Sequence, residues 1–176
     1  MEVARAHPRA IILREKDMSE EEYRELAAWF LPICREEGTK LFLHYFYRVA
    51  QELKPDGLHL PLHVLEELGS VNALGVSELG ASCHSVEDAI RAEKLGCSYI
   101  VAGHIYDTDC KKGLPGRGLE FLRKVTGEMT FPVYAIGGIT PENIDEVRNS
   151  GAAGACIMSS AMECENVEEL LKQFSR

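Results

Sequence analysis

The sequence predicts an α/β fold built on a parallel sheet. Seven short apolar segments recur along the chain, and nearly every one is followed by a stretch with helical spacing of apolar residues. Strands that alternate with helices in this way form parallel sheets with right-handed crossovers. Both a doubly wound open sheet and a (β/α) barrel fit the pattern, and both place ligand sites at the carboxyl ends of the strands. The predicted strands are Ala10–Leu13, Leu41–Leu43, Gly57–Leu60, Ser77–Ser82, Ser98–Ala102, Pro132–Ile136 and Ala155–Met158.

Start and stop signals predict the helices. Ser19 and Glu22 match a capping box, and apolar residues continue at helical spacing to Cys34, with a kink expected at Pro32. Thr140–Glu142 combines an N-cap residue, a proline at the first helical position and an acid, which predicts a helix that begins there. Further helices are expected over residues 46–53, 62–68, 86–95, 118–126 and 167–174.

Composition narrows the function classes. The chain has 176 residues, 45% of them hydrophobic, and its 19 basic and 28 acidic residues give a net charge of −9. We therefore expect one globular domain over residues 1–176 that binds neither nucleic acid nor an anionic membrane, because such binding depends on Lys and Arg. None of the six cysteines lies in a C-x-x-C pair, so neither a zinc site nor a disulfide framework is expected. Without a signal peptide or an apolar span, the predicted location is the cytoplasm.

Two neighbouring strand ends predict a phosphate site. Gly137 and Gly138 follow a strand directly before the predicted helix, and glycine lets backbone N–H groups approach an anion closely. Met158 and Ser159 end the next strand and add a hydroxyl that faces the same direction. In barrels, the last two strand ends often hold phosphate. The alternative interpretation is that Gly137 and Gly138 only form a tight turn.

The loop from Gly103 to Gly113 is a second candidate. It begins with His104 at a strand end and continues with acids, Cys110, Lys111 and Lys112. An imidazole can transfer a proton near neutral pH, and the lysines can neutralise an anion. The loop could equally be a solvated connection with an incidental histidine.

Arg14 and Lys16 are a third candidate. They are predicted to lie two residues apart on one strand, so both side chains would point to the same side of it. Two cations that face a barrel mouth indicate an anionic ligand. The alternative is a structural network of ion pairs with nearby acids such as Glu15 and Asp17.

Four segments together resemble the thiamine-phosphate-synthase superfamily, in matching order and over nearly the whole chain. They are Leu13–Asp17, Gly57–Leu60, Gly80–Ser85 and Ala135–Asn143. The resemblance implies a TIM-type (β/α) barrel that acts on a small phosphorylated thiazole. Aligned by motif, Leu13–Asp17 matches the second strand of the family's barrel, so the chain is expected to lack the first βα unit. The exposed strand edges that would result favour a homo-oligomer.

The sequence also departs from the synthase pattern. Where the synthases have Asn-Asp after the second predicted strand and an aspartate after the third, this chain has His44-Tyr45 and Val64. Those aspartates serve Mg²⁺ and the pyrophosphate of the substrate in the family. The Gly103–Gly113 loop instead resembles the thiazole tautomerase branch, in which the histidine of Gly-His is the general acid/base.

The resemblance therefore implies a tautomerase that aromatises a carboxythiazole phosphate in thiamin biosynthesis without metal or cofactor. The implied catalytic residue is His104. The implied substrate-binding residues are Arg14, Lys16, Ser82, Thr108, Lys111, Gly137, Gly138, Met158 and Ser159.

Two alternatives remain beside the tautomerase. One is thiamine-phosphate synthase activity, which joins a pyrimidine pyrophosphate to the thiazole phosphate and would bring Mg²⁺ as its cofactor. The other is a non-catalytic regulator on the same fold, which would bind the phosphorylated ligand tightly without turnover.

Overall fold

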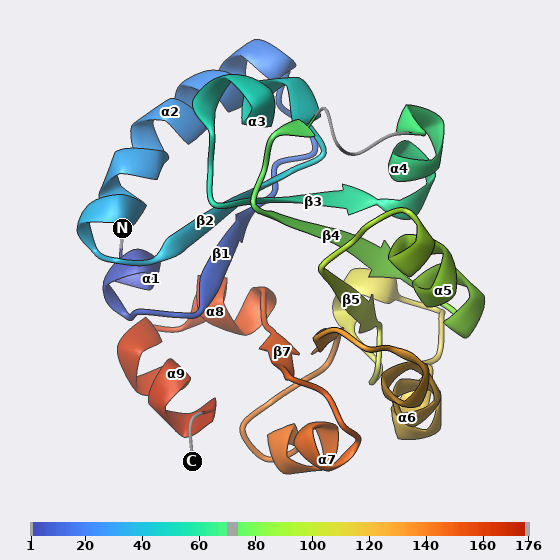
Figure 1. Cartoon of the computed structure of the whole chain (residues 1–176). Helices are drawn as coiled ribbons and strands as arrows, with labels where there is room; N and C mark the ends of the chain where they lie inside the picture. Colours follow the sequence, from blue (N-terminus) through green and yellow to red (C-terminus); the bar gives the residue numbers. More distant parts are fainter. Residues whose placement is uncertain (1, 70–73, 175–176) are drawn as a thin grey trace.

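A computed structural model describes residues 2–69 and 74–174 of the chain. The strands form one parallel sheet whose spatial order is the order of the sequence, from β1 to β7. The sheet curls into an open barrel surrounded by helices (Figure 1). This sequential order confirms the prediction of a barrel-type α/β fold and excludes the doubly wound alternative, in which the order reverses. The strands are β1 (Ala10–Leu13), β2 (Lys40–His44), β3 (Gly57–Pro61), β4 (Glu78–Cys83), β5 (Tyr99–Gly103), β6 (Val133–Ile136) and β7 (Gly154–Cys156).

The two outer strands leave the barrel open. Within the described residues, β1 pairs only with β2 and β7 pairs only with β6. The predicted seven strands are therefore confirmed, with a gap between the first and the last. The helices are α1 (Glu2–Arg5), α2 (Glu20–Glu36), α3 (Tyr47–Leu53), α4 (Leu62–Leu68), α5 (Val86–Lys94), α6 (Gly118–Glu128), α7 (Ile144–Asn149), α8 (Ser159–Glu163) and α9 (Val167–Phe174), with a short 3-10 helix, η2, at Asp109–Lys111. None of them, in the described part of the chain, has the length and apolar character to cross a membrane.

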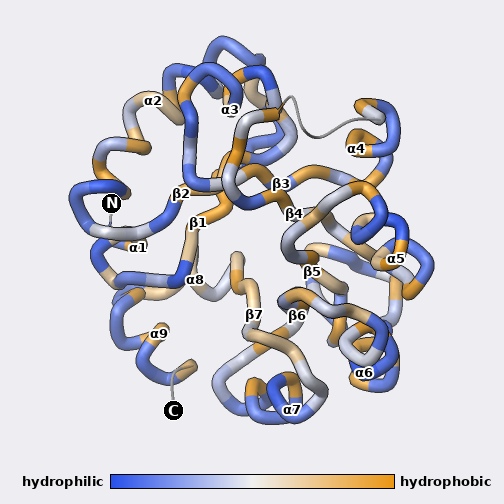
Figure 2. The backbone as a smooth tube through the Cα atoms, viewed as in Figure 1, coloured by the Kyte–Doolittle hydropathy of each residue, from blue (hydrophilic) through white to orange (hydrophobic). Residues whose placement is uncertain are grey.

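Strand side chains alternate between two cores. One set of strand residues, including Leu41, Leu58 and Ile100, points outward and packs with the helices into the main core. The other set points into the barrel, where Phe42, Tyr99 and Val101 form a separate cluster. Figure 2 shows the apolar strands inside and the more polar helical faces outside. Burial of both faces explains why the strands read as nearly continuous apolar runs.

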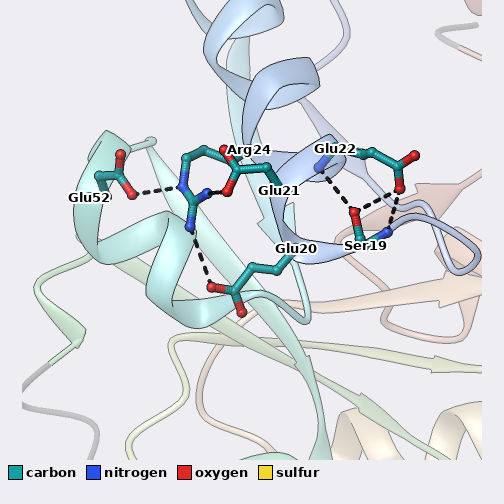
Figure 3. A network of polar contacts seen from close by, with 6 residues as sticks. All are labelled: Ser19, Glu20, Glu21, Glu22, Arg24 and Glu52. Carbon is teal, nitrogen blue, oxygen red and sulfur yellow. Dashed lines mark hydrogen bonds and ion pairs between the residues drawn. The ribbon is translucent and has the colours of Figure 1, made fainter.

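The N-terminus of α2 is fixed by polar contacts (Figure 3). The Ser19 side chain accepts a hydrogen bond from the Glu22 N–H, and the Glu22 carboxylate accepts one from the Ser19 N–H at 2.8 Å. This confirms the predicted capping box. Arg24 bonds to Glu21 and, at 2.9 Å, to Glu52 of α3, so it ties two neighbouring helices together.

Two local predictions need correction, and α2 extends past Cys34, where its apolar pattern ends. The helix expected from Thr140 begins at Ile144, because Thr140 N–H bonds to the Asn143 side-chain oxygen at 2.9 Å and holds residues 140–143 in a turn. The last strand ends at Cys156, so Met158 lies beyond it and precedes α8, a helix the sequence pattern did not predict. Finally, α2 continues through Pro32 as one helix to Glu36.

Candidate active site

The inside of the barrel holds a connected group of polar side chains. His59, in the middle of β3 and only 3% exposed, has its Nδ1 3.1 Å from the hydroxyl oxygen of Tyr99, the first residue of β5, and its Nε2 2.9 Å from the Ser82 Oγ. The His44 ring, at the end of β2, stacks on the His59 ring with centroids 5.9 Å apart. All four side chains fall on inward-facing positions of their strands. The register places His44, His59 and Tyr99 at one level, and Ser82 lies two residues further along β4. They form the floor of the barrel mouth, and we use "mouth floor" for these four residues.

Burial and positive neighbours keep the two imidazoles neutral. Desolvation, together with the charges of Arg14 and Lys16, lowers the pKa of His44 to about 4. Desolvation lowers the pKa of His59 to about 3, with a smaller contribution from His44 and Arg14. At neutral pH, both rings are therefore uncharged. A neutral imidazole carries one N–H donor and one acceptor nitrogen.

Arg14 and Lys16 follow β1, which ends at Leu13, so the prediction that they lie on one strand is wrong. Both are exposed, and their charges reach the ring of His44 on the neighbouring strand. Within residues 2–69 and 74–174, neither makes a salt bridge. The structure therefore does not support the alternative, in which Arg14 and Lys16 belong to a structural network of ion pairs.

His104 lies at the end of β5 and is 9% exposed. Its Nε2 is 3.2 Å from the Leu114 carbonyl oxygen. Because a carbonyl can only accept, Nε2 carries the proton in the neutral ring. The Gly103 carbonyl accepts a bond from His84 Nδ1 at 2.7 Å and from Arg117 Nε at 3.2 Å, which fixes the strand end before the loop.

The two glycines after β6 are required by packing. Gly137 and Gly138 have φ of +99° and +64°, a region that favours glycine. A Cβ on Gly137 would lie 2.3 Å from the His104 Cβ, and one on Gly138 would lie 2.7 Å from the Tyr106 Cβ. The tight turn and the close approach of the β5 loop thus account for both glycines. A phosphate bound to the same turn stays a prediction.

The loop after β5 meets the segment after β7. Cys110 Sγ lies 3.4 Å from Ser159 Oγ. Thr108 caps the 3-10 helix η2, which contains Lys111, by accepting from the Cys110 N–H at 3.4 Å. Thr108, Lys111 and Ser159 are thereby placed at one side of the mouth, while Arg14, Lys16 and Ser82 lie with the floor. Met158 is 47% exposed next to Ser159.

Sequence reasoning missed His44 and Tyr99 and treated His59 as one of several scattered histidines. The signal that could have found them is the alternation of side chains between the two faces of a strand. It places His44, His59, Ser82 and Tyr99 on inward-facing positions. Polar residues at inward positions of a small barrel require partners. A strand-by-strand assignment of inward positions would have grouped them.

The residues at the mouth do not fit a magnesium ion. Mg²⁺ prefers carboxylate oxygens, and the part of the chain that the structure describes has no cluster of three His, Cys, Asp or Glu side chains that could hold a metal. Two acids in the segments that follow β4 and β5 bind backbone N–H groups. Asp88 accepts from the His84 N–H at 2.8 Å, and Asp107 accepts from the Gly116 N–H at 2.7 Å.

Comparison with known proteins identifies the family. The family described as thiamine monophosphate synthase matches residues 1–161. The chain belongs to this family. A thiamine-phosphate synthase of Chlorobium luteolum is 34% identical over 166 residues, which are 93% of this chain and 78% of the relative. One from Pyrococcus furiosus is 32% identical over 172 residues, 95% of this chain and 81% of the relative. A solved structure of thiamine phosphate pyrophosphorylase from Pyrococcus furiosus superposes with a TM-score of 0.84 at 31% identity, covering 99% of this chain and 84% of that one.

These relatives contradict the predicted isomerase activity. Curated members at 30–34% identity over most of the chain bear the name of the synthase, a transferase, so the expectation of a thiazole tautomerase is wrong. That expectation depended on the Gly103–Gly113 loop and on His44-Tyr45 and Val64, which replace acidic residues of the synthase pattern. Similarity over the whole chain outweighs these features. The resemblance to the superfamily itself is confirmed.

Proposed function

We propose that this chain is a transferase that joins a pyrimidine pyrophosphate to a thiazole phosphate, as the names of its relatives indicate. In that reaction the bond between the pyrimidine methylene carbon and the pyrophosphate oxygen breaks. A new bond forms between the same carbon and the thiazole nitrogen, and the products are thiamine phosphate and pyrophosphate. The observation that carries the proposal is the 34% identity over 93% of the chain to a protein named for this activity.

The mouth supplies groups for both anions in this scheme. Arg14 and Lys16 would hold the departing pyrophosphate, because unpaired cations stabilise the negative charge that develops on a leaving group. Thr108, Lys111 and Ser159, with the N–H groups around Gly137 and Gly138, would hold the phosphate of the thiazole. Met158 would cover the ligand at the rim, and Ser82, bonded to His59, would face the pyrimidine.

His104 has a positioning role in this proposal. Its Nε2–H donates to Leu114, which lies in the same loop as Thr108 and Lys111. By holding that loop over the mouth, the imidazole orders the groups that meet the thiazole phosphate. No step in this scheme passes through Mg²⁺, because the residues present do not fit the ion.

The decisive experiment mixes purified protein with both substrates and measures thiamine phosphate by chromatography. We expect product and equimolar pyrophosphate. An Arg14→Gln variant should lose most of the rate, whereas Lys94→Gln, an exposed lysine on α5, should retain it. Absence of product under all metal conditions would refute the proposal.

A second candidate, a ligand-binding protein without turnover, is favoured by the absence of metal-binding carboxylates at the mouth in the described residues. The same experiment separates the two, since this candidate binds thiazole phosphate in a calorimeter but forms no product. Under either function the unpaired edges of β1 and β7 favour self-association, which light scattering can test.

A further inference from the structure

Every charged or titratable side chain that acts on the two imidazoles of the mouth floor is a cation or another imidazole. The groups that influence His44 are Arg14 and Lys16, and those that influence His59 are His44 and Arg14. No carboxylate acts on either ring among the described residues. In a chain with a net charge of −9, this leaves one locally positive region at the carboxyl end of the sheet.

The acid between the two cations acts on a different part of the fold. Glu15, between Arg14 and Lys16, acts instead on Tyr23 of α2, whose hydroxyl donates to the Leu13 carbonyl and accepts from the His44 N–H. Arg14 and Lys16, by contrast, act on the ring of His44, and neither forms a salt bridge with a carboxylate among the described residues.

The His44 ring offers an additional donor. It stacks between the rings of His59 at 5.9 Å and Tyr45 at 6.4 Å, measured between centroids. Neither of its nitrogens makes a hydrogen bond to any residue that the structure describes, although its backbone N–H bonds to Tyr23. The residue is half-buried, and none of the described residues occupies either ring nitrogen.

We infer that the mouth binds a diphosphate directly, through Arg14, Lys16 and the imidazole N–H of His44, with no divalent cation between the protein and the ligand. Two positive charges and one neutral donor replace the arrangement in which carboxylates hold a metal that in turn holds the diphosphate. A divalent cation at this position would face two positive side chains without a carboxylate to offset their repulsion. The inference rests on the proposed function only for the choice of diphosphate as ligand.

Calorimetric titration with inorganic pyrophosphate tests this directly. We expect the same dissociation constant, within about two-fold, in chelator-treated buffer and in buffer with excess Mg²⁺ once free pyrophosphate is corrected for its metal complex. Arg14→Gln and Lys16→Gln should each weaken binding about ten-fold, which corresponds to about 1.4 kcal/mol. His44→Phe keeps an aromatic ring in the stack and removes the N–H, so it should weaken binding about three-fold or more.

Two controls keep the result interpretable. Lys94→Gln removes a lysine from the last turn of α5 and should bind like the wild type. In nuclear magnetic resonance spectra, pyrophosphate should shift the imidazole signals of His44 but not those of His7, which precedes β1 at the opposite end of that strand. This readout does not require that a variant be folded, because it uses the wild-type chain.

The outcomes separate this inference from the proposed function. Pyrophosphate binding that requires Mg²⁺, or a His44 signal that does not respond, overturns the inference whether or not thiamine phosphate is formed. Metal-independent binding with no thiamine phosphate supports the inference and contradicts the proposed function.

Discussion

The ring of Tyr99 occupies the space that a side chain on Gly80 would need. The two residues face each other on β5 and β4, and a Cβ built on Gly80 would lie 2.1 Å from the Tyr99 Cζ. Tyr99 cannot move away easily, because its ring is 5% exposed and its hydroxyl contacts His59 Nδ1 at 3.1 Å. Because Gly80 has no side chain, the ring of Tyr99 can fill this space and take its place in the mouth floor.

Replacement of Gly80 should therefore destabilise the barrel interior. Gly80→Ala is expected to lower the free energy of unfolding by about 1–3 kcal/mol, the range for overpacked cores. The matched control is Gly127→Ala in α6, where a Cβ meets nothing within 4 Å, and which should stabilise by about 0.5–1 kcal/mol. Urea unfolding of both variants measures the difference. Equal effects of the two substitutions would contradict the assigned packing.

The capping box of α2 gives a second prediction (Figure 3). Ser19→Ala removes the acceptor for the Glu22 N–H and should lower the free energy of unfolding by about 1 kcal/mol. Ser19→Thr keeps the hydroxyl and should stay close to the wild type. By contrast, Arg24→Gln removes exposed ion pairs and should cost less than about 1 kcal/mol. A larger loss for Arg24→Gln than for Ser19→Ala in thermal unfolding would show this ranking to be wrong.

Buried neutral histidines make stability depend on pH. His59 has its pKa lowered from 6.5 to about 3 in the folded chain, chiefly by desolvation. Between these values the unfolded chain binds a proton that the folded chain does not, so stability decreases as the pH falls from about 6.5 toward 3. The slope is at most about 1.4 kcal/mol per pH unit for one group, and His44, with a pKa lowered to about 4, acts in the same direction.

The measurement is a comparison of urea unfolding at several pH values between pH 7 and pH 5. His59→Gln keeps donor and acceptor atoms near Ser82 and Tyr99 but has no titrating ring. Its free energy of unfolding should therefore fall less steeply with decreasing pH than that of the wild type. The carboxylates titrate equally in both proteins and cancel in the difference. Parallel pH profiles would contradict a buried neutral imidazole.

The strands and most helices were predictable because local signals agree with the fold. Apolar runs bounded by turn residues gave all seven strands, and Ser19 gave the start of α2. At Thr140 the local signal failed. There the side chain of Asn143 bonds to both the Thr140 N–H and the Gly138 carbonyl, and this competing turn delays the helix to Ile144.

The candidate site was predictable where charged residues directly follow a strand. Arg14 and Lys16 come after β1, and the charges of both act on the His44 ring of the mouth floor. The contact between Cys110 and Ser159 joins residues 49 positions apart, and the bonds of His59 reach Ser82 and Tyr99 on two other strands. Contacts of this kind depend on strand register, which the sequence pattern does not specify.

The bond between His104 and Leu114 predicts how the thiazole phosphate is held. His104→Ala removes the donor at Nε2, which releases the loop that carries Thr108 and Lys111. Loss of one such bond and of the ordered loop should weaken binding of thiazole phosphate about ten-fold, or about 1.4 kcal/mol, in a calorimetric titration. His104→Gln retains an N–H that can reach the carbonyl and should recover part of the affinity, while His7→Ala, before β1, should have no effect. If turnover instead fell about hundred-fold in His104→Ala with unchanged affinity, the imidazole would act on the reacting atoms rather than through the loop.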